Sequence, residues 1–180
     1  QFFSFPKSLL KTANALRTPG SQIGFLLLCG YFKATKRFFL PQDFLQRDIE
    51  AVSKLLNHPV DTFLVDSYAK TTRQRHQKLI LEFYGFTLFD SKNESTLATE
   101  IATMAKTYLK PKLIFDRCVD FLIQKKIQVP VAWVVTELIR SGLQEHKSSL
   151  VTLMDIHLDN QIRYLLDNLF TTPGDQYQYR

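Results

Sequence analysis

The residues best suited to chemistry lie in one stretch, residues 70–89. The stretch begins with four basic side chains and no acidic one, namely Lys70, Arg73, Arg75 and Lys78. Thr71 and Thr72 favour a helix start, where free backbone N–H groups can hold a phosphate. The later residues are apolar and aromatic. We therefore predict one short helix that contacts phosphates at its basic end and packs in a core at its apolar end.

A helical wheel separates the two kinds of side chain in this stretch. The apolar arc contains Leu79, Ile80, Phe83 and Tyr84, and the opposite arc contains Lys70, Arg75 and Lys78. We expect the first arc to be buried and the second to face solvent. The same pattern also fits a solvated basic face on an ordinary helix.

Charge is unevenly placed along the 180 residues, which carry a net charge of +6. Residues 1–42 contain six basic residues and no acid, and the first acid is Asp43. A basic segment beside a neutral remainder indicates a polyanion or an anionic membrane as partner. The one clean apolar run, residues 23–32, is far shorter than a bilayer span, so the membrane is the weaker alternative.

Signals of catalysis or metal binding are weak. His58 and His157 have no local partner of the kind that activates a nucleophile. Asp116 and Asp120 lie one helical turn apart and could hold Mg²⁺, but the basic residues around them favour an ordinary solvated face. We expect no catalytic residue, no metal and no cofactor.

The two cysteines, Cys29 and Cys118, stand alone in apolar stretches. Their spacing matches no zinc motif, and two buried thiols fit a reducing cytosol. Trp133 fits a core or interface aromatic better than a base-stacking one, because no second exposed aromatic is predicted beside it.

The elements that must position these residues are predicted to be helices. Apolar residues recur at spacings of three and four in several segments: Leu45, Ile49, Val52 and Leu56 after Pro41; Leu97, Ile101, Met104 and Tyr108; Phe115, Val119 and Leu122 before Lys125; residues 130–142; and residues 162–169. The predicted fold is all-α.

The polar run 90–94 separates two halves of similar size. We predict two tandem helical units resembling helix-turn-helix domains, residues 1–90 and 91–180. The two halves carry similar segments at similar places, which suggests an internal duplication: Gly30-Tyr-Phe-Lys33 in the first and Thr107-Tyr-Leu-Lys110 in the second.

Several segments, taken in order, resemble the N-terminal region of Tn-three family transposases. The first, residues 17–32, keeps the Gly24-Phe25 pair of a family motif, but Gln22-Ile23 replaces its Asn-Arg-Leu step. The second supplies a tyrosine, a Thr-Arg pair, a histidine and an aromatic exit at matching spacing: Tyr68, Thr72-Arg73, His76 and Phe83-Tyr-Gly-Phe-Thr-Leu-Phe89. The third comprises Lys125-Lys-Ile-Gln-Val-Pro130, and residues 160–169 are similar to the helix that follows it.

The resemblance spans residues 17–170 and implies a function. It implies a tandem helical region that reads transposon terminal inverted repeats as the N-terminal part of a transposase. The implied partners are double-stranded DNA and the rest of the transposase chain. A second copy of the chain, forming a homodimer, is a further candidate partner. The resemblance implies no enzyme activity for this chain, since the catalytic carboxylates of the family lie in a C-terminal domain that this chain does not contain. It places the protein in the bacterial cytoplasm, at the nucleoid when bound.

The candidate DNA-binding residues follow from basic charge and the motif positions. Phosphate contacts supply affinity and base contacts supply specificity. Arg73, Gln74 and Gln77 are the expected base readers, because arginine pairs with guanine and glutamine with adenine. The full set is Arg17, Gln22, Lys33, Lys36, Arg37, Thr72, Arg73, Gln74, Arg75, His76, Gln77 and Lys78 in the first half, with Lys110, Lys112, Lys125, Lys126 and a predicted turn at His146, Lys147, Ser148 and Ser149 in the second.

The alternative function is a helical protein-interaction or dimerisation module without DNA specificity, whose Phe-rich grooves hold a partner helix. A continuous basic stripe joining residues 17–37 to 70–78 favours DNA, whereas a neutral apolar groove favours a protein partner.

Overall fold

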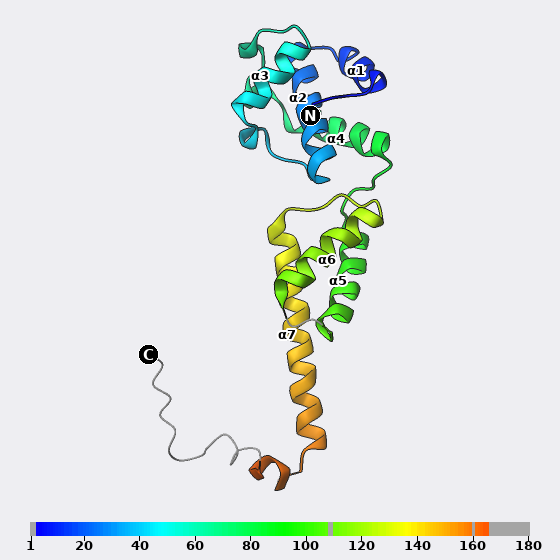
Figure 1. Cartoon of the computed structure of the whole chain (residues 1–180), viewed down its shortest axis with the longest axis vertical. Helices are drawn as coiled ribbons and strands as arrows, with labels where there is room; N and C mark the ends of the chain where they lie inside the picture. The colour runs from blue at the N-terminus through cyan, green and yellow to red at the C-terminus, as the bar shows by residue number, and fades with distance from the viewer. Residues whose placement is uncertain (1–2, 108–109, 160, 166–180) are drawn as a thin grey trace, which may run out of the picture.

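The structure is a computed structural model that describes residues 3–107, 110–159 and 161–165 (Figure 1). It is all-α, as predicted. The α-helices are α1 (Lys7–Asn14), α2 (Pro19–Thr35), α3 (Gln46–Leu55), α4 (Lys70–Tyr84), α5 (Ser91–Ala105), α6 (Pro111–Gln124) and α7 (Ala132–His157). Short 3-10 helices cover Pro41–Asp43, Val60–Thr62 and Val65–Ser67. Over the described residues there is no β-strand, only an isolated bridge between Thr87 and Ile127.

The N-terminal core is built around α2, which contacts α1, α3 and α4. Nearly every residue from Ile23 to Phe32 is buried. A helix surrounded on all sides must be apolar all round, which explains the uninterrupted apolar run. The Thr18 hydroxyl caps the start of α2 by accepting a hydrogen bond from the Ser21 N–H at 3.2 Å.

The C-terminal core is a separate cluster formed by α5, α6 and α7. Its fully buried side chains include Leu97, Ile101, Ile114, Leu122 and Val135. Figure 1 shows α1–α4 at one end of the molecule and α5–α7 at the other. None of the helices in the described part of the chain is both long and apolar enough to cross a membrane.

The two cores are joined at a junction of backbone hydrogen bonds. The Thr87 N–H donates to the Lys126 carbonyl at 2.8 Å, and the Gln128 N–H donates back to the Thr87 carbonyl at 2.9 Å. A third bond runs from the Val129 N–H to the Lys36 carbonyl at 2.9 Å. The end of α2, the exit from α4 and the end of α6 therefore meet at one place.

Several predicted helix boundaries were wrong. Pro41 begins a 3-10 turn, and α3 starts only at Gln46. The polar run 90–94, predicted as the boundary between the two halves, coincides with the start of α5, where the Asp90 carboxylate accepts the Asn93 N–H at 2.8 Å and caps the helix. The last predicted helix is helical over residues 161–165; Tyr108 and residues 166–169 lie outside the described residues.

The helix predicted to end near Gly142 instead runs to His157. Gly142 lies at a close contact with α5, where an added Cβ would be 2.7 Å from the Ile101 side chain. The glycine therefore serves helix packing and does not end the helix. The predicted turn at 146–149 was consequently wrong, and those residues lie inside α7.

Candidate nucleic-acid interface

Helix α4 carries the basic stretch, and its two ends are set by different local signals. Gly85 ends the helix in the left-handed conformation with φ of 67°, which glycine adopts without steric cost. At the start, Ala69 holds the capping position without a side-chain hydrogen bond. Thr71 and Thr72 therefore lie within the first turn and do not cap the helix.

The inner face of α4 is anchored by His76, Ile80 and Leu81, all buried. The His76 Nδ1 and the Tyr68 hydroxyl oxygen are 2.6 Å apart and share a hydrogen bond. The His76 ring also meets the Phe25 ring edge to face, with centroids 5.4 Å apart. Burial, with a smaller effect of the Arg75 charge, lowers the pKa of His76 to about 4. The prediction that His76 contacts DNA was wrong, because the side chain has no accessible surface.

Gly24 makes room for this cluster. A Cβ at residue 24 would lie 2.7 Å from the Tyr68 ring, which covers α2 at that point. The Gly-Phe pair on α2, the tyrosine before α4 and the histidine on α4 are thus in mutual contact. These motif residues hold α4 against α2, so their role in this chain is to fix the orientation of the helix.

The outer face of α4 presents Lys70, Gln74, Arg75 and Lys78 to solvent. The ion pairs of the described residues are Arg47–Asp48, Lys112–Asp116, Arg140–Glu137 and Arg163–Asp155. None of them involves α4, so among these residues no acidic side chain lies within 4.0 Å of a basic group of that helix. The predicted site residues Thr72, Arg73 and Gln77 are only half-exposed. The exposed face is therefore centred on Gln74, Arg75 and Lys78.

Two members of the predicted buried arc are in fact exposed. Leu79 keeps 36% of its surface accessible and Phe83 keeps 43%. α4 packs on α2 through the side that carries His76 and Ile80, and Tyr84 is half-buried on that same side. Leu79 and Phe83 lie beyond the edge of that contact.

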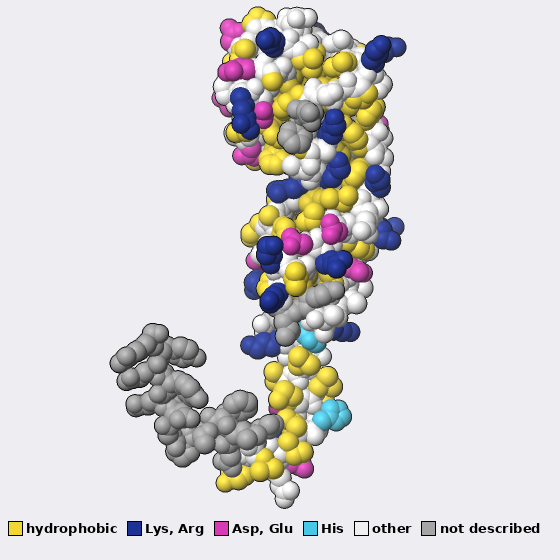
Figure 2. Space-filling model, in the orientation of Figure 1, with side chains coloured by type: hydrophobic (Ala, Val, Ile, Leu, Met, Phe, Trp, Pro, Cys, Tyr) yellow, Lys and Arg dark blue, Asp and Glu magenta, His cyan; other side chains and the backbone are white. Residues whose placement is uncertain are grey.

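A second group of cations gathers at the junction; we call it the junction cluster and define it as Lys33, Lys36, Arg37, Lys125 and Lys126. Burial, the charge of Lys126 and the charge of Lys33 all hold the pKa of Lys36 below its usual range. The Lys126 ammonium lies 5.0 Å from the centre of the Phe86 ring, and the Arg37 guanidinium lies 5.5 Å from that of Phe39. Figure 2 shows several Lys and Arg side chains where the two halves of the molecule adjoin, and others scattered over the visible face without forming a continuous stripe there.

Two lysines of the junction cluster hold unusual backbone conformations. Lys36 has φ of 58° and Lys126 has φ of 56°, both in the left-handed region. Such residues cost free energy and persist where the surrounding structure holds them, often at functional sites. Here Lys36 caps the end of α2 and Lys126 follows the residue that caps α6, and the carbonyl of each accepts one of the junction hydrogen bonds. The fold thus holds the two lysines beside each other.

The other candidates lie elsewhere. Arg17 is exposed between α1 and α2. Gln22 has a structural role, because its amide donates to the Leu16 carbonyl at 3.0 Å and its side-chain oxygen is 2.8 Å from the His58 ring nitrogen. Lys110 precedes α6 and is exposed. His146, Ser148 and Ser149 lie inside α7, where a turn was predicted.

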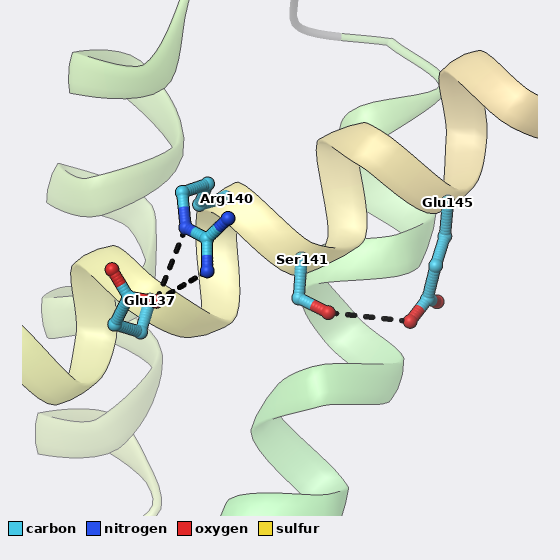
Figure 3. A network of polar contacts seen from close by, with 4 residues as sticks. All are labelled: Glu137, Arg140, Ser141 and Glu145. Atoms are coloured by element: carbon cyan, nitrogen blue, oxygen red, sulfur yellow. Dashed lines mark hydrogen bonds and ion pairs between the residues drawn. The ribbon is translucent and has the colours of Figure 1, made fainter.

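Lys112 and Lys147, predicted separately, line one groove between α6 and α7, together with Arg140, which the sequence reasoning missed. Arg140 binds the Glu137 carboxylate at 2.7 Å, and the Ser141 hydroxyl donates to Glu145 one turn later at 3.3 Å (Figure 3). A helical spacing of three between Glu137 and Arg140 is the signal that could have found this pair.

The other residues considered for chemistry are a carboxylate, the possible metal ligands, the two cysteines and the tryptophan. The Asp116 carboxylate pairs with Lys112 at 3.4 Å, which supports the solvated-face interpretation of that region. Within residues 3–107, 110–159 and 161–165, no three His, Cys, Asp or Glu side chains gather as a metal site. Both cysteines are buried, and burial raises the pKa of Cys118 to about 12. Trp133 is 71% exposed and so is not a core residue.

Comparison with known proteins gives one family. The model of a domain of unknown function, DUF4158, matches residues 1–142. No curated protein matches the chain. The matched segment contains α1–α6, the junction cluster and the first part of α7. The chain therefore belongs to the DUF4158 family, which is associated with Tn-three family transposases.

Proposed function

We propose that this chain binds double-stranded DNA sequence-specifically and recognises transposon terminal inverted repeats as the N-terminal part of a transposase. The observation that carries the proposal is the outer face of α4, where exposed cations have no acidic partner among the described ion pairs. The association of the family with transposases supports terminal repeats as the DNA.

The base-reading residues are Gln74 and Arg75, two exposed polar residues of α4. In the major groove, arginine pairs bidentately with guanine and glutamine with adenine. Arg73 and Gln77, the readers expected from sequence, are half-exposed and lie at the flank of this face. Lys70 and Lys78 contact phosphates on either side of the read bases.

The junction cluster adds phosphate contacts at the far end of α4. α4 has 15 residues, so it is about 22 Å long at 1.5 Å per residue. Burial lowers the pKa of Lys36, and repulsion from the Lys126 charge lowers it further in the free protein. A phosphate between them relieves this repulsion, so binding there raises the pKa of Lys36 towards its ordinary value.

The test is a fluorescence anisotropy titration of the 180-residue chain with a terminal-repeat duplex and with a shuffled duplex of the same composition, over a salt series. We expect tighter binding to the repeat and a steep salt dependence. Arg75→Ala should cost about 1–3 kcal/mol on the repeat and little on the shuffled duplex. Arg47→Ala is the matched control, because Arg47 is exposed on α3 and paired with Asp48. Equal affinity for the two duplexes would refute specific recognition.

A second candidate function is a helical protein-interaction or dimerisation module without DNA specificity. The groove between α6 and α7 favours it, because its floor is apolar: Phe115, Ile139 and Leu143. The same titration separates the two functions, since an interaction module binds both duplexes weakly and alike.

A further inference from the structure

The two halves of the molecule are joined through a small junction. The extensive contacts between helices lie within α1–α4 or within α5–α7, which Figure 1 shows end to end. The N–H groups of Thr87, Gln128 and Val129 donate the backbone hydrogen bonds that link the halves. The Lys126 ammonium of the second half also lies over the Phe86 ring of the first. Because a region held by few contacts opens more readily than a packed core, the junction is the weakest link between the two cores.

Like charges face each other across this junction. Lys36 belongs to the first half and Lys126 to the second. Burial lowers the pKa of Lys36, and the charges of Lys126 and Lys33 lower it further. The ammonium groups therefore lie close enough to repel one another. This repulsion acts across the junction and opposes the hydrogen bonds that hold the halves together.

The charges of the junction cluster are not neutralised within the described part of the chain. None of its members takes part in the ion pairs there. The Lys33 ammonium donates to the Ser4 carbonyl at 2.9 Å, and the Lys36 ammonium donates to the Lys33 carbonyl at 2.6 Å. These contacts orient the two side chains but leave both charges uncompensated. The Arg37 Nε is buried and has no hydrogen-bond partner among the described residues, which costs free energy.

We propose that a single phosphate group binds between Lys36 and Lys126 and fastens the two halves of the molecule to each other. Each ammonium has three N–H donors, and Lys36 uses one of them on the Lys33 carbonyl. The others donate charge-assisted hydrogen bonds to the phosphate oxygens, and the Arg37 Nε supplies a further donor. The anion replaces repulsion between the halves by attraction of both halves to one charge.

Two sources could supply this phosphate group. One is a phosphodiester of the DNA backbone, and the other is free inorganic phosphate. As a contact to DNA the site rests on the proposed function, whereas as a phosphate site it rests on the junction alone. Occupation by either source should stabilise the closed junction, because a ligand that binds only the closed form suppresses opening.

The experiment is amide hydrogen exchange of the isotope-labelled 180-residue chain, followed by NMR, in inorganic phosphate and in chloride at equal ionic strength. The N–H groups of Thr87, Gln128 and Val129 donate the junction hydrogen bonds and report on its opening. Their exchange should slow about tenfold at a phosphate concentration of about ten times the Kd. Phosphate also stabilises folded proteins generally. The Asn93 N–H, which the Asp90 carboxylate caps at the exposed start of α5, is therefore the control amide.

Three substitutions test the lysines. Lys36→Met and Lys126→Met should each abolish the slowing by phosphate. Lys54→Met is the matched control and should keep it, because Lys54 is an exposed lysine of α3 outside the junction cluster. Lys126→Glu places a carboxylate beside Lys36, so the junction amides should exchange slowly in chloride and respond no further to phosphate. Circular dichroism melting of each variant verifies the fold.

Equal exchange of the junction amides in phosphate and in chloride would overturn the proposal. A slowing that persists in both methionine variants, or that Asn93 shares, would also overturn it. The same measurement with the terminal-repeat and shuffled duplexes distinguishes the sources. Slowing by the duplexes assigns the site to a DNA phosphodiester, and slowing by inorganic phosphate alone assigns it to the free anion. Failure of sequence-specific DNA binding leaves the phosphate result unaffected, and absence of a phosphate effect leaves the anisotropy comparison of the duplexes unaffected.

Discussion

The buried histidine of α4 should make the stability of this protein depend on pH in the mildly acidic range. His76 has a folded-state pKa of about 4, below the ordinary value of about 6.5. Between these values the unfolded chain binds the proton and the folded chain does not. The contribution of His76 is therefore fully present above pH 6.5 and is lost as the pH falls toward 4. From these two pKa values, the free energy of unfolding should fall by about 2 kcal/mol between pH 7 and pH 5 through this residue alone.

The assay is urea denaturation followed by circular dichroism at several pH values, with linear extrapolation to water. Carboxylates also titrate in this range, so the informative quantity is the difference between the native chain and His76→Gln. This difference should shrink toward pH 5, whereas His157→Gln, on the exposed end of α7, should parallel the native chain. An NMR titration of the His76 ring measures its pKa without any substitution. A ring pKa near 6.5, or equal pH slopes for the native chain and His76→Gln, would refute the reasoning.

Three further changes test the packing of α4 and the junction. Gly24→Ala should destabilise the fold by about 1–3 kcal/mol because its Cβ overlaps the buried Tyr68 ring, whereas Gly20→Ala, with no contact closer than 3.4 Å, should not; equal denaturation midpoints would contradict this. Tyr68→Phe should cost about 1–3 kcal/mol in urea denaturation, because it leaves His76 Nδ1 buried without its partner. Lys36→Ala should weaken binding to repeat and shuffled duplexes alike and reduce the salt slope by about one; a loss confined to the repeat would assign Lys36 to base reading.

Local sequence signals predicted the helices well where packing agreed with them. Apolar spacing located α5 and α6, and the uninterrupted run of α2 indicated a buried segment. Gly142 misled the prediction of α7, because a glycine that permits close approach to Ile101 looks in sequence like one that ends a helix. The difference between the two roles depends on α5, which is distant in the chain.

The basic stretch shows a similar limit. A helical wheel separates two faces, but it does not say which direction the core lies in. The contact with α2 set that direction, and it buried His76 while leaving Leu79 and Phe83 exposed. Of the predicted site residues on α4, Arg75 and Lys78 are therefore exposed, whereas His76 is buried.

By itself, the sequence determined the all-α class, the placement of positive charge and the motif residues of the resemblance, because these depend on composition and on spacings within a few turns. Only the tertiary structure decided that Gly24, Tyr68 and His76 form one packed cluster, and that Lys36 and Lys126 stand beside each other. Burial and charge proximity arise when distant segments meet, and a helical period carries no information about which segments those are.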